Sequence, residues 1–401
     1  MPLLHPASGC HLEGKLLPLA PVLLYRAAHG RSTPSAILHD MPSKGTGGRP
    51  RPLVLVILDG FGISFIDQGN AVRAAHMAHL EEYLRFYPCT TLRASGIEVG
   101  LPWGEVGNSE VGHKNMGSGR IIYQSLPQIT FAIQDGSFFR NVAFQEAAAH
   151  VKERPSAALH LVGLVSRGGV HSHLDHLLAL LDFAAREGIG KRTFLHAMLD
   201  GRDSAPVSAG QYMTEVDRTM QRLGEGHVAS VIGRYYAMDR NNNWDRTKIA
   251  YDLIVSGTGT PYRSWQDALE DAYEHRKTDE FVPASVIADG RVPLRTIRDG
   301  DAVLLFNFRP DRARQLTHAL VLRNFSPFPV AAFTDLSVVT MTEYEKDLPA
   351  TIAFPEAWAQ VPIGRVLADH GLRQLRIAET EKYAHVTYYF NSGRELPFPN
   401  E

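Results

Sequence analysis

The sequence predicts an α/β protein built around a mainly parallel sheet. Short apolar runs of strand length recur along the chain, segments with helical spacing follow them, and polar residues gather where the runs end. A chain of 401 residues is long enough for two domains with sizeable cores. Its composition, 44% hydrophobic and 21% charged residues, is ordinary for a globular enzyme.

The first 51 residues differ from the rest, and we expect a disordered leader over 1–51. The stretch LLPLAPVLLY, 16–25, resembles the apolar part of a signal peptide, but two prolines interrupt it. Residues 31–52 are rich in proline, glycine and serine, which is typical of a linker.

The first expected strand covers 52–60, an apolar run of the buried type that ends in Asp-Gly. Helical spacing predicts a helix over 70–88 that stops at Pro88, and a second strand follows over 90–96. A glycine-rich run comes next and leads into an expected helix over 109–117.

Downstream, four expected strands each precede an expected helix, which indicates parallel strands joined by helical crossovers. The strands cover 158–166, 192–200, 227–233 and 301–308. The helices cover 173–188, 207–222, 245–257 and 311–323. Loops that follow parallel strands meet at one edge of a sheet, so catalytic loops are expected there.

The bulk numbers disfavour several classes of function. A net charge of −2 gives no support to a general nucleic-acid-binding role. No apolar run approaches the length of a membrane span. Two cysteines, Cys10 and Cys89, are too few for a disulfide framework, so we expect a reducing compartment.

Two polar residues stand out in the first third of the chain. Asp59 ends the first expected strand, where a carboxylate is well placed to bind a metal, although Asp-Gly is also a common turn. Ser109 follows the glycine-rich loop, and a helix that starts there suits a phosphate group. An ordinary serine N-cap explains the same spacing at least as well. A reacting serine needs an activator, and none is obvious beside it.

Cationic residues follow the later strands. The run GGVHSHLDH, 168–176, carries His171, and such a cluster can bind zinc, hold a phosphate or fill a loop. One arginine pair is usually a surface salt bridge. Several pairs at one end of a sheet favour a small polyanionic substrate, because the guanidinium fork binds carboxylate and phosphate. These residues are Arg202 with Asp203, Arg234 with Arg240, and Arg309 with Arg312; Lys382 is either a further cation of the site or a solvated side chain.

From about residue 52 onward the chain resembles the cofactor-independent phosphoglycerate mutases of the alkaline phosphatase superfamily. The matching stretches include VILDGFG, GEVGNSEVGHKNMGSGR, GGVHSHLDH, HAMLDGRD, IGRYYAMDR, NFRPDRARQ and AETEKYAHVTYYF, in family order and with family-like spacing. The resemblance implies an isomerase that interconverts 3-phosphoglycerate and 2-phosphoglycerate in glycolysis and gluconeogenesis through a phosphoserine intermediate.

The resemblance also implies roles for individual residues. The family uses two manganese ions, Mn²⁺, and one of them binds the nucleophilic serine, matched here by Ser109, and lowers its pKa. Asp59 matches a ligand of the same ion. Asp203 matches a candidate general base that acts while the glycerate reorients. The matched substrate-binding residues are His171, Arg202, Asp203, Arg234, Arg240, Arg309, Arg312 and Lys382.

The family has a phosphatase-like domain that an inserted transferase domain splits in sequence. The resemblance implies a first phosphatase-like segment at 52–124, the insertion at 125–355 and a second segment at 356–401. A longer C-terminal stretch supplies the family's remaining metal ligands, so we expect only part of one metal site here and an incomplete mutase. We further expect a small-molecule substrate, no nucleic-acid or membrane partner, a monomer and a cytoplasmic location.

Two other functions stay open. A related metal-dependent phosphohydrolase would pass the phosphoryl group from Ser109 to water, although a hydrolase has no need of cations that hold the acceptor. A catalytically inactive protein would bind phosphoglycerate through the inserted domain alone, without dependence on Ser109 or metal.

Overall fold

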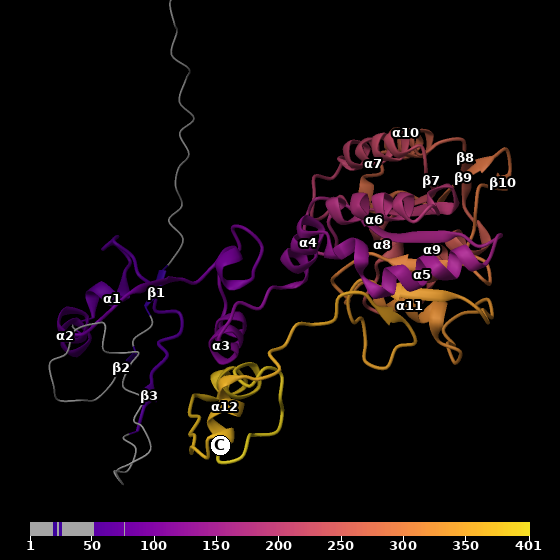
Figure 1. Ribbon diagram of the computed structural model, residues 1–401. Coiled ribbons are helices and arrows are strands. Elements are labelled where there is room, and N and C mark those ends of the chain that lie inside the picture. The colour runs from indigo at the N-terminus through magenta and orange to yellow at the C-terminus, as the bar shows by residue number, and fades with distance from the viewer. Residues whose placement is uncertain (1–18, 22–23, 26–51, 76) are drawn as a thin grey trace, which may run out of the picture. The chain divides into compact units, whose positions relative to one another are not determined.

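The computed structural model describes residues 19–21, 24–25, 52–75 and 77–401, and these form two compact units. The first unit joins the residues up to Ile122 to Trp358–Glu401, and the second is Tyr123–Ala357. The chain thus leaves the first unit after Ile122 and returns to it at Trp358 (Figure 1). Most of the expected leader, with Cys10, lies outside the described residues.

A nine-stranded sheet forms the centre of the second unit, all of whose residues are described. Its parallel part has the spatial order β7 (His227–Gly233), β6 (Thr193–Leu199), β5 (Leu159–Val165), β11 (Ala302–Leu305), β12 (Ser337–Thr340) and β13 (Thr351–Ile352). At the β7 side of the sheet, β9 (Ser285–Asp289) pairs antiparallel with β7. Two short strands, β8 (Thr260–Tyr262) and β10 (Val292–Pro293), pair with β9. The predicted α/β fold with a mainly parallel sheet is confirmed.

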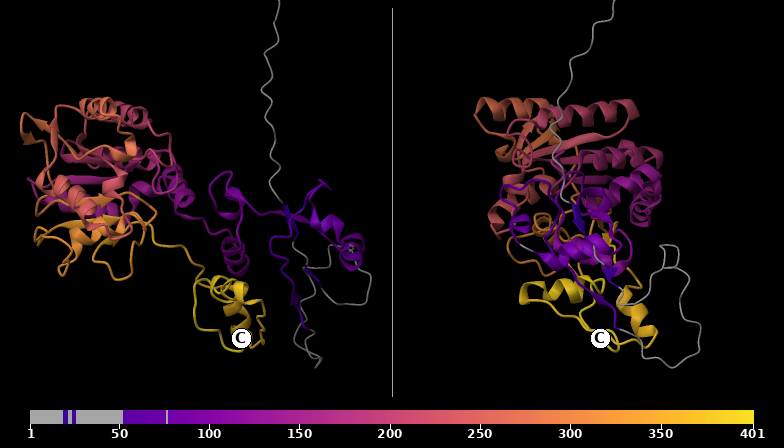
Figure 2. Two further views of the ribbon diagram at one scale, coloured as in Figure 1. Left: turned by 180° about the vertical axis from the view of Figure 1, so that it is seen from behind. Right: turned by 90° about the vertical axis from the view of Figure 1, so that its left-hand side faces the viewer.

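Helices cover both faces of this sheet. Successive strand residues point to opposite faces, and every residue of β5 is buried, so both faces need a cover. One hydrophobic core lies between the sheet and α4 (Ser125–Asp135), α5 (Val142–Glu153), α6 (Leu174–Arg186), α7 (Ala209–Leu223) and α10 (Trp265–Glu274). The other core lies between the sheet and α8 (Arg234–Ala237), α9 (Trp244–Ser256) and α11 (Arg314–Val321). Figures 1 and 2 show this layered unit from three sides.

The four predicted strand and helix repeats of this unit are confirmed, with ends that differ by at most three residues. Local chemistry fixes several of these ends. The ring of His173 accepts a hydrogen bond from the backbone N–H of Asp175 and caps α6. Helix α7 stops at Gly224, whose φ of 68° suits glycine.

The first unit contains shorter elements. Before Ile122 these are β3 (Val54–Leu55), α1 (Ala71–Ala74), α2 (Ala78–Phe86), β4 (Thr91–Arg93), the 3₁₀ turn η2 (Gly96–Val99) and α3 (Ser109–Ser118). After Trp358 they are α12 (Ile363–Asp369), the 3₁₀ turn η6 (Thr380–Lys382) and the π-helical turn η7 (His385–Tyr389). Antiparallel pairs join β4 to β1 (Leu19–Pro21) and β3 to β2 (Leu24–Tyr25).

Two predictions for the first unit are wrong in extent. The run 52–60 forms only the two-residue strand β3, and the side chains of Leu53 and Val54 are 73% and 59% exposed rather than buried. The single helix predicted over 70–88 is two helices, α1 and α2, and α2 has no buried residue. An apolar pattern stabilises an element chiefly through the surface against which it packs, and the described residues offer these elements little such surface.

Among the described residues, every helix is too short or too polar to cross a membrane.

Candidate active site

The loop between β4 and α3 folds back on itself and presents Ser109. A Cβ added to Gly107 would lie 1.7 Å from the carbonyl oxygen of Ala94, so only glycine allows this close approach. The side chain of Asn108 caps α3 by accepting a hydrogen bond from the N–H of Val111 at 2.9 Å. Ser109 is therefore the first residue of the helix and not its N-cap, which leaves its hydroxyl free for other partners.

The hydroxyl of Ser109 is held by two charged groups. It donates a short hydrogen bond to Asp59, and the ammonium of Lys382 donates to Ser109 Oγ at 2.8 Å. Lys382 also lies 3.1 Å from Asp59 Oδ2. Burial would raise the pKa of Asp59, but the hydrogen bonds from Ser109 and Lys382 outweigh it and lower the pKa. The structure thus brings together three predicted residues that lie far apart in sequence.

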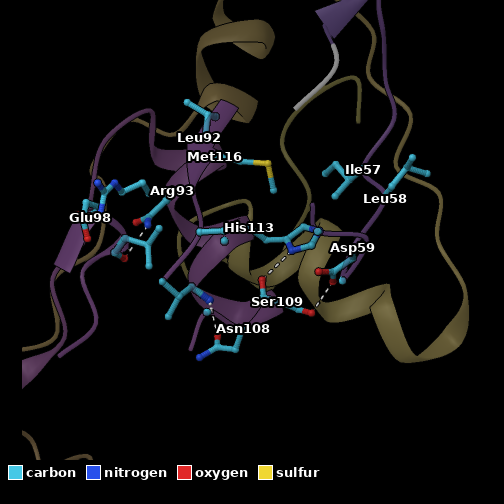
Figure 3. A pocket seen from close by; sticks show the side chains of 18 of the residues that line it. Ile57, Leu58, Asp59, Leu92, Arg93, Glu98, Asn108, Ser109, His113 and Met116 are labelled. Carbon is cyan, nitrogen blue, oxygen red and sulfur yellow. Dashed lines mark hydrogen bonds and ion pairs between the residues drawn. The ribbon is translucent and has the colours of Figure 1, made fainter. Parts of the chain in front are cut away.

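A pocket of about 740 Å³ opens beside this serine and is shown in Figure 3. Asp59, Ser109 and His113 line it, together with apolar residues of 55–58. His113 Nδ1 lies 2.7 Å from the carbonyl oxygen of Ser109, and burial lowers the pKa of the ring, so the histidine is neutral near pH 7. Its contact is to the backbone carbonyl of Ser109 and not to the hydroxyl.

The described residues fit a metal ion only in part. Asp59 and Ser109 supply two oxygens, and hard cations such as Mn²⁺ need more ligands than two. In the part of the chain that the structure describes, no three histidine, cysteine or carboxylate side chains come together as a metal site. Asp369 and His370 are occupied locally, by Arg365 and by the carbonyl oxygen of Val366. We therefore derive no chemical step through a metal.

A second group of polar residues lies in the second unit. They follow β5, β6, β7 and β11, which are parallel neighbours, so the loops after them share one edge of the sheet. Six predicted residues occupy these loops: His171, Arg202, Asp203, Arg240, Arg309 and Arg312, and the seventh, Arg234, begins α8 directly after β7.

Arg234 anchors the centre of this group. Its Nη1 lies 2.6 Å from Asp200 Oδ1 and 2.5 Å from Asp203 Oδ2, and the side chains of Arg234 and Asp200 are almost fully buried. Removing either partner of such a pair leaves an unpaired buried charge. Asp200 also accepts hydrogen bonds from the N–H groups of Arg202 and Asp203, so it shapes the loop that carries them.

Arg240, Arg309 and the ring of His171 lie around Asp311, while Arg312 Nη1 donates to the carbonyl oxygen of Met238 at 3.1 Å. Arg240 Nη1 lies 3.0 Å from Asp311 Oδ2, Arg309 Nε lies 3.3 Å from Asp311 Oδ1, and His171 Nδ1 lies 3.5 Å from the same oxygen. Burial and the neighbouring Arg234 lower the pKa of His171 to about 4, so its ring is neutral at pH 7. The Arg202 side chain is more exposed and lies 3.4 Å from Glu280. 

The histidine cluster of 168–176 does not act as one group. His171 lies among the arginines, 3.8 Å from Asp203, while His173 caps α6. His176 is fully buried, and its Nε2 lies 3.2 Å from Thr130 Oγ1. Within the described residues, no metal site is formed from these histidines.

Two residues of the site were missed in the sequence. Asp200 and Asp311 are the carboxylates that hold the arginines in place. A signal for both was present, because Asp200 precedes Gly-Arg-Asp and Asp311 stands between two arginines of NFRPDR. Only their position among the candidate cations points to a role in the site, because aspartates are common in turns without any function.

Comparison with known proteins identifies close relatives. Residues 129–346 match the family model of the BPG-independent phosphoglycerate mutase N-terminus. The 2,3-bisphosphoglycerate-independent phosphoglycerate mutases of Thermomicrobium roseum and Moorella thermoacetica are each 53% identical to this chain over 88% of its length. The chain covers 68% of each of those proteins.

A solved structure of a phosphoglycerate mutase is also similar to this chain. The match comes from work described as crystal structures of Leishmania mexicana phosphoglycerate mutase at low cobalt concentration, with a TM-score of 0.61 and 30% sequence identity. It covers 82% of this chain, and the chain spans 62% of that protein.

Proposed function

The chain belongs to the 2,3-bisphosphoglycerate-independent phosphoglycerate mutases, and we propose that it moves the phosphoryl group of phosphoglycerate between the 3-oxygen and the 2-oxygen, with Ser109 as the intermediate carrier. The observation that carries this proposal is the cation group at the sheet edge of the second unit, which consists of Arg202, Arg234, Arg240, Arg309 and Arg312. Phosphoglycerate offers them a phosphate and a carboxylate, the two anions that arginine binds best.

The same cations favour a mutase over a phosphohydrolase. A hydrolase releases its alcohol product after phosphoryl transfer, whereas a mutase must keep the glycerate and turn it. Charge-assisted contacts from Arg240, Arg309 and Arg312 to the carboxylate would retain it through that turn.

In the proposed transfer, Ser109 Oγ forms a bond to phosphorus as the bond from phosphorus to the 3-oxygen breaks. Asp59 accepts the hydrogen bond of the attacking hydroxyl and takes its proton, and the departing 3-oxygen takes up a proton from solvent water, while Lys382 stabilises negative charge on the serine oxygen. The return step forms the bond to the 2-oxygen and breaks the one to Ser109, whose oxygen regains its proton from Asp59, and we assign Asp203 as the group that takes the proton of the attacking 2-hydroxyl.

Further parts of the proposal come from the family resemblance. We propose Mn²⁺ as the metal, with Asp59 and Ser109 as two of its ligands. The ion would stabilise charge on the serine oxygen. We also propose a cytoplasmic, glycolytic and monomeric protein, in which 125–355 is an inserted transferase domain that binds the substrate and 52–124 and 356–401 are segments of a phosphatase-like domain.

The test follows 3-phosphoglycerate becoming 2-phosphoglycerate in a coupled assay with Mn²⁺ and without 2,3-bisphosphoglycerate. It uses the 401-residue chain and, in parallel, the same chain joined to the C-terminal part of the Thermomicrobium roseum relative that lies beyond the match. We expect turnover by the extended chain. Release of free phosphate would identify a hydrolase instead, and binding without either reaction would identify an inactive binding protein.

A substitution in the extended chain tests the serine. Ser109→Ala should lower kcat by roughly 10³-fold or more and abolish labelling of the protein from ³²P-phosphoglycerate, because the carrier hydroxyl is gone. Ser118→Ala removes a hydroxyl from the other end of α3, where it contacts Ser392, and should leave both readouts unchanged. Retained mutase activity in the Ser109 variant would refute the assignment.

A further inference from the structure

A carboxylate that the proposed reaction does not use lies in the middle of the cation group. Asp311 follows β11 in the turn before α11, between Arg309 and Arg312. Its oxygens lie 3.0 Å from Arg240 Nη1, 3.3 Å from Arg309 Nε and 3.5 Å from His171 Nδ1. These three partners come from three different loops, so one side chain links the loops that follow β5, β7 and β11.

The ion pairs of Asp311 are less exposed to solvent than ordinary surface ion pairs. Its side chain is 29% exposed, and the oxygen that faces Arg309 and His171 is buried and accepts no hydrogen bond in the described structure. The backbone reinforces the same junction, because the N–H of Phe308 donates to the carbonyl oxygen of His171 at 2.8 Å. The loop of Asp311 and the loop of His171 are therefore already fixed to each other.

The cations around Asp311 repel one another. Burial lowers the pKa of Arg312, and the nearby charges of Arg240 and Arg234 lower it further. Arg240 and Arg309 have side chains that are each 48% exposed, so without a counter-charge they are free to swing into water. Asp311 carries the charge that keeps these two close together.

We propose that Asp311 is a positioning residue, which holds Arg240 and Arg309 beside His171 before substrate arrives. This inference rests on the proposed function, since it assumes that these arginines bind the anionic groups of phosphoglycerate. A ligand that meets side chains already in place does not have to order them. Asp311 itself stays in contact with the arginines and forms no bond to the reacting atoms.

The experiment compares Asp311→Asn and Asp311→Glu with the unchanged 401-residue chain. Calorimetry measures the Kd for 3-phosphoglycerate, and ¹⁵N relaxation measures the motion of the Arg309 Nε–H group. We expect Asp311→Asn to raise the Kd by roughly tenfold, as the ordering of one or two freed side chains implies, and to increase the motion of Arg309. Asp311→Glu keeps the charge and should restore much of both.

A matched control removes a carboxylate from another ion pair of the same unit. Asp335 lies 2.7 Å from Arg154 Nε, is half exposed and is not part of the cation group, so Asp335→Asn should change neither readout. An Asp311→Asn variant that binds as tightly as the unchanged chain, or more tightly, overturns the inference, as does an Arg309 side chain that stays equally ordered. If the unchanged chain itself does not bind 3-phosphoglycerate, the proposed function fails, while the Arg309 readout still tests the positioning role.

Discussion

His176 shows how burial fixes the state of a single residue. Its side chain is fully buried, its Nδ1 has no hydrogen-bond partner in the described structure, and burial lowers its pKa to about 3. An unfolded histidine has a pKa near 6.5, so between about pH 6.5 and pH 3 this histidine is protonated in the unfolded chain and neutral in the folded chain. The stability that this group provides is therefore complete above about pH 6.5 and is lost as the pH falls toward 3.

The pH dependence of unfolding tests this effect. Between pH 7.5 and pH 5 the unchanged chain should lose about 2 kcal/mol of unfolding free energy through His176 alone, and His176→Gln should not show this part of the loss. Urea titrations at both pH values measure the difference. His275→Gln, at a side chain that is 72% exposed, serves as the control and should keep the full pH dependence. Equal losses in the two variants would contradict the prediction.

For single residues, the sequence predicts which residues belong to the site better than it predicts which of them contact each other. The cations after β5, β6, β7 and β11 could be chosen because strand order places them at one sheet edge. The contact of Lys382 with Ser109 could not, since 273 residues separate them and no strand pairing links them. Asp311 was missed for a related reason, because its role depends on three loops that only the folded sheet brings together.

Helix α3 is the element on which the geometry around Ser109 depends. It packs directly on η7 and the residue after it, so closely that a Cβ on Gly117 would lie 1.9 Å from the carbonyl oxygen of Phe390. The segment that includes η6 and η7 also carries Lys382, which contacts Ser109. Close packing of these two segments therefore keeps the ammonium at the serine.

A pair of glycine substitutions in α3 separates this packing from helix propensity. Gly117→Ala should destabilise the first unit by about 1–3 kcal/mol, because the backbone of Phe390 must move. Gly112→Ala enters open space on the same helix and should stabilise it by up to about 1 kcal/mol. Hydrogen exchange of residues 383–393 should become faster in the first variant only. Equal exchange in both would show that the contact at Gly117 does not hold η7.

The success of element prediction follows the amount of packing. The strands β5, β6, β7 and β11 are buried between two layers of helices, and there the apolar runs predict them well. In the first unit the same kind of run, 52–60, yields two strand residues, because the described residues leave Leu53 and Val54 exposed. A periodic pattern shows which face of an element is apolar. Whether another part of the protein packs against that face depends on the rest of the fold.

At the scale of the whole molecule, the two hydrophobic cores belong to one unit. Every buried residue of both cores lies between Ile129 and Phe354, within the second unit. A unit with its own complete core is expected to fold independently. The predicted roles of the segments, with an inserted transferase domain at 125–355, remain a proposal.

A fragment experiment tests this independence. Residues 123–357 expressed alone should unfold in one cooperative urea transition and bind 3-phosphoglycerate with the affinity of the full chain, because the cation group lies entirely within them. Residues 52–122 expressed alone should show no cooperative transition, since no residue of β3, α1 or α2 is buried. A fragment 123–357 without a cooperative transition would show that its core needs the first unit.

The position of β5 in the sheet also affects how the protein is made. Its two neighbours are β6, which follows closely in sequence, and β11, which begins 143 residues later, as the pairing of Leu159 with Ala302 shows. At a synthesis rate of about 5–20 residues per second, roughly 7–30 s pass before β11 exists. During that interval one side of the central strand has no partner and can pair with another nascent chain. Translation speed between β5 and β11 thus sets how long each new molecule is exposed to misassembly.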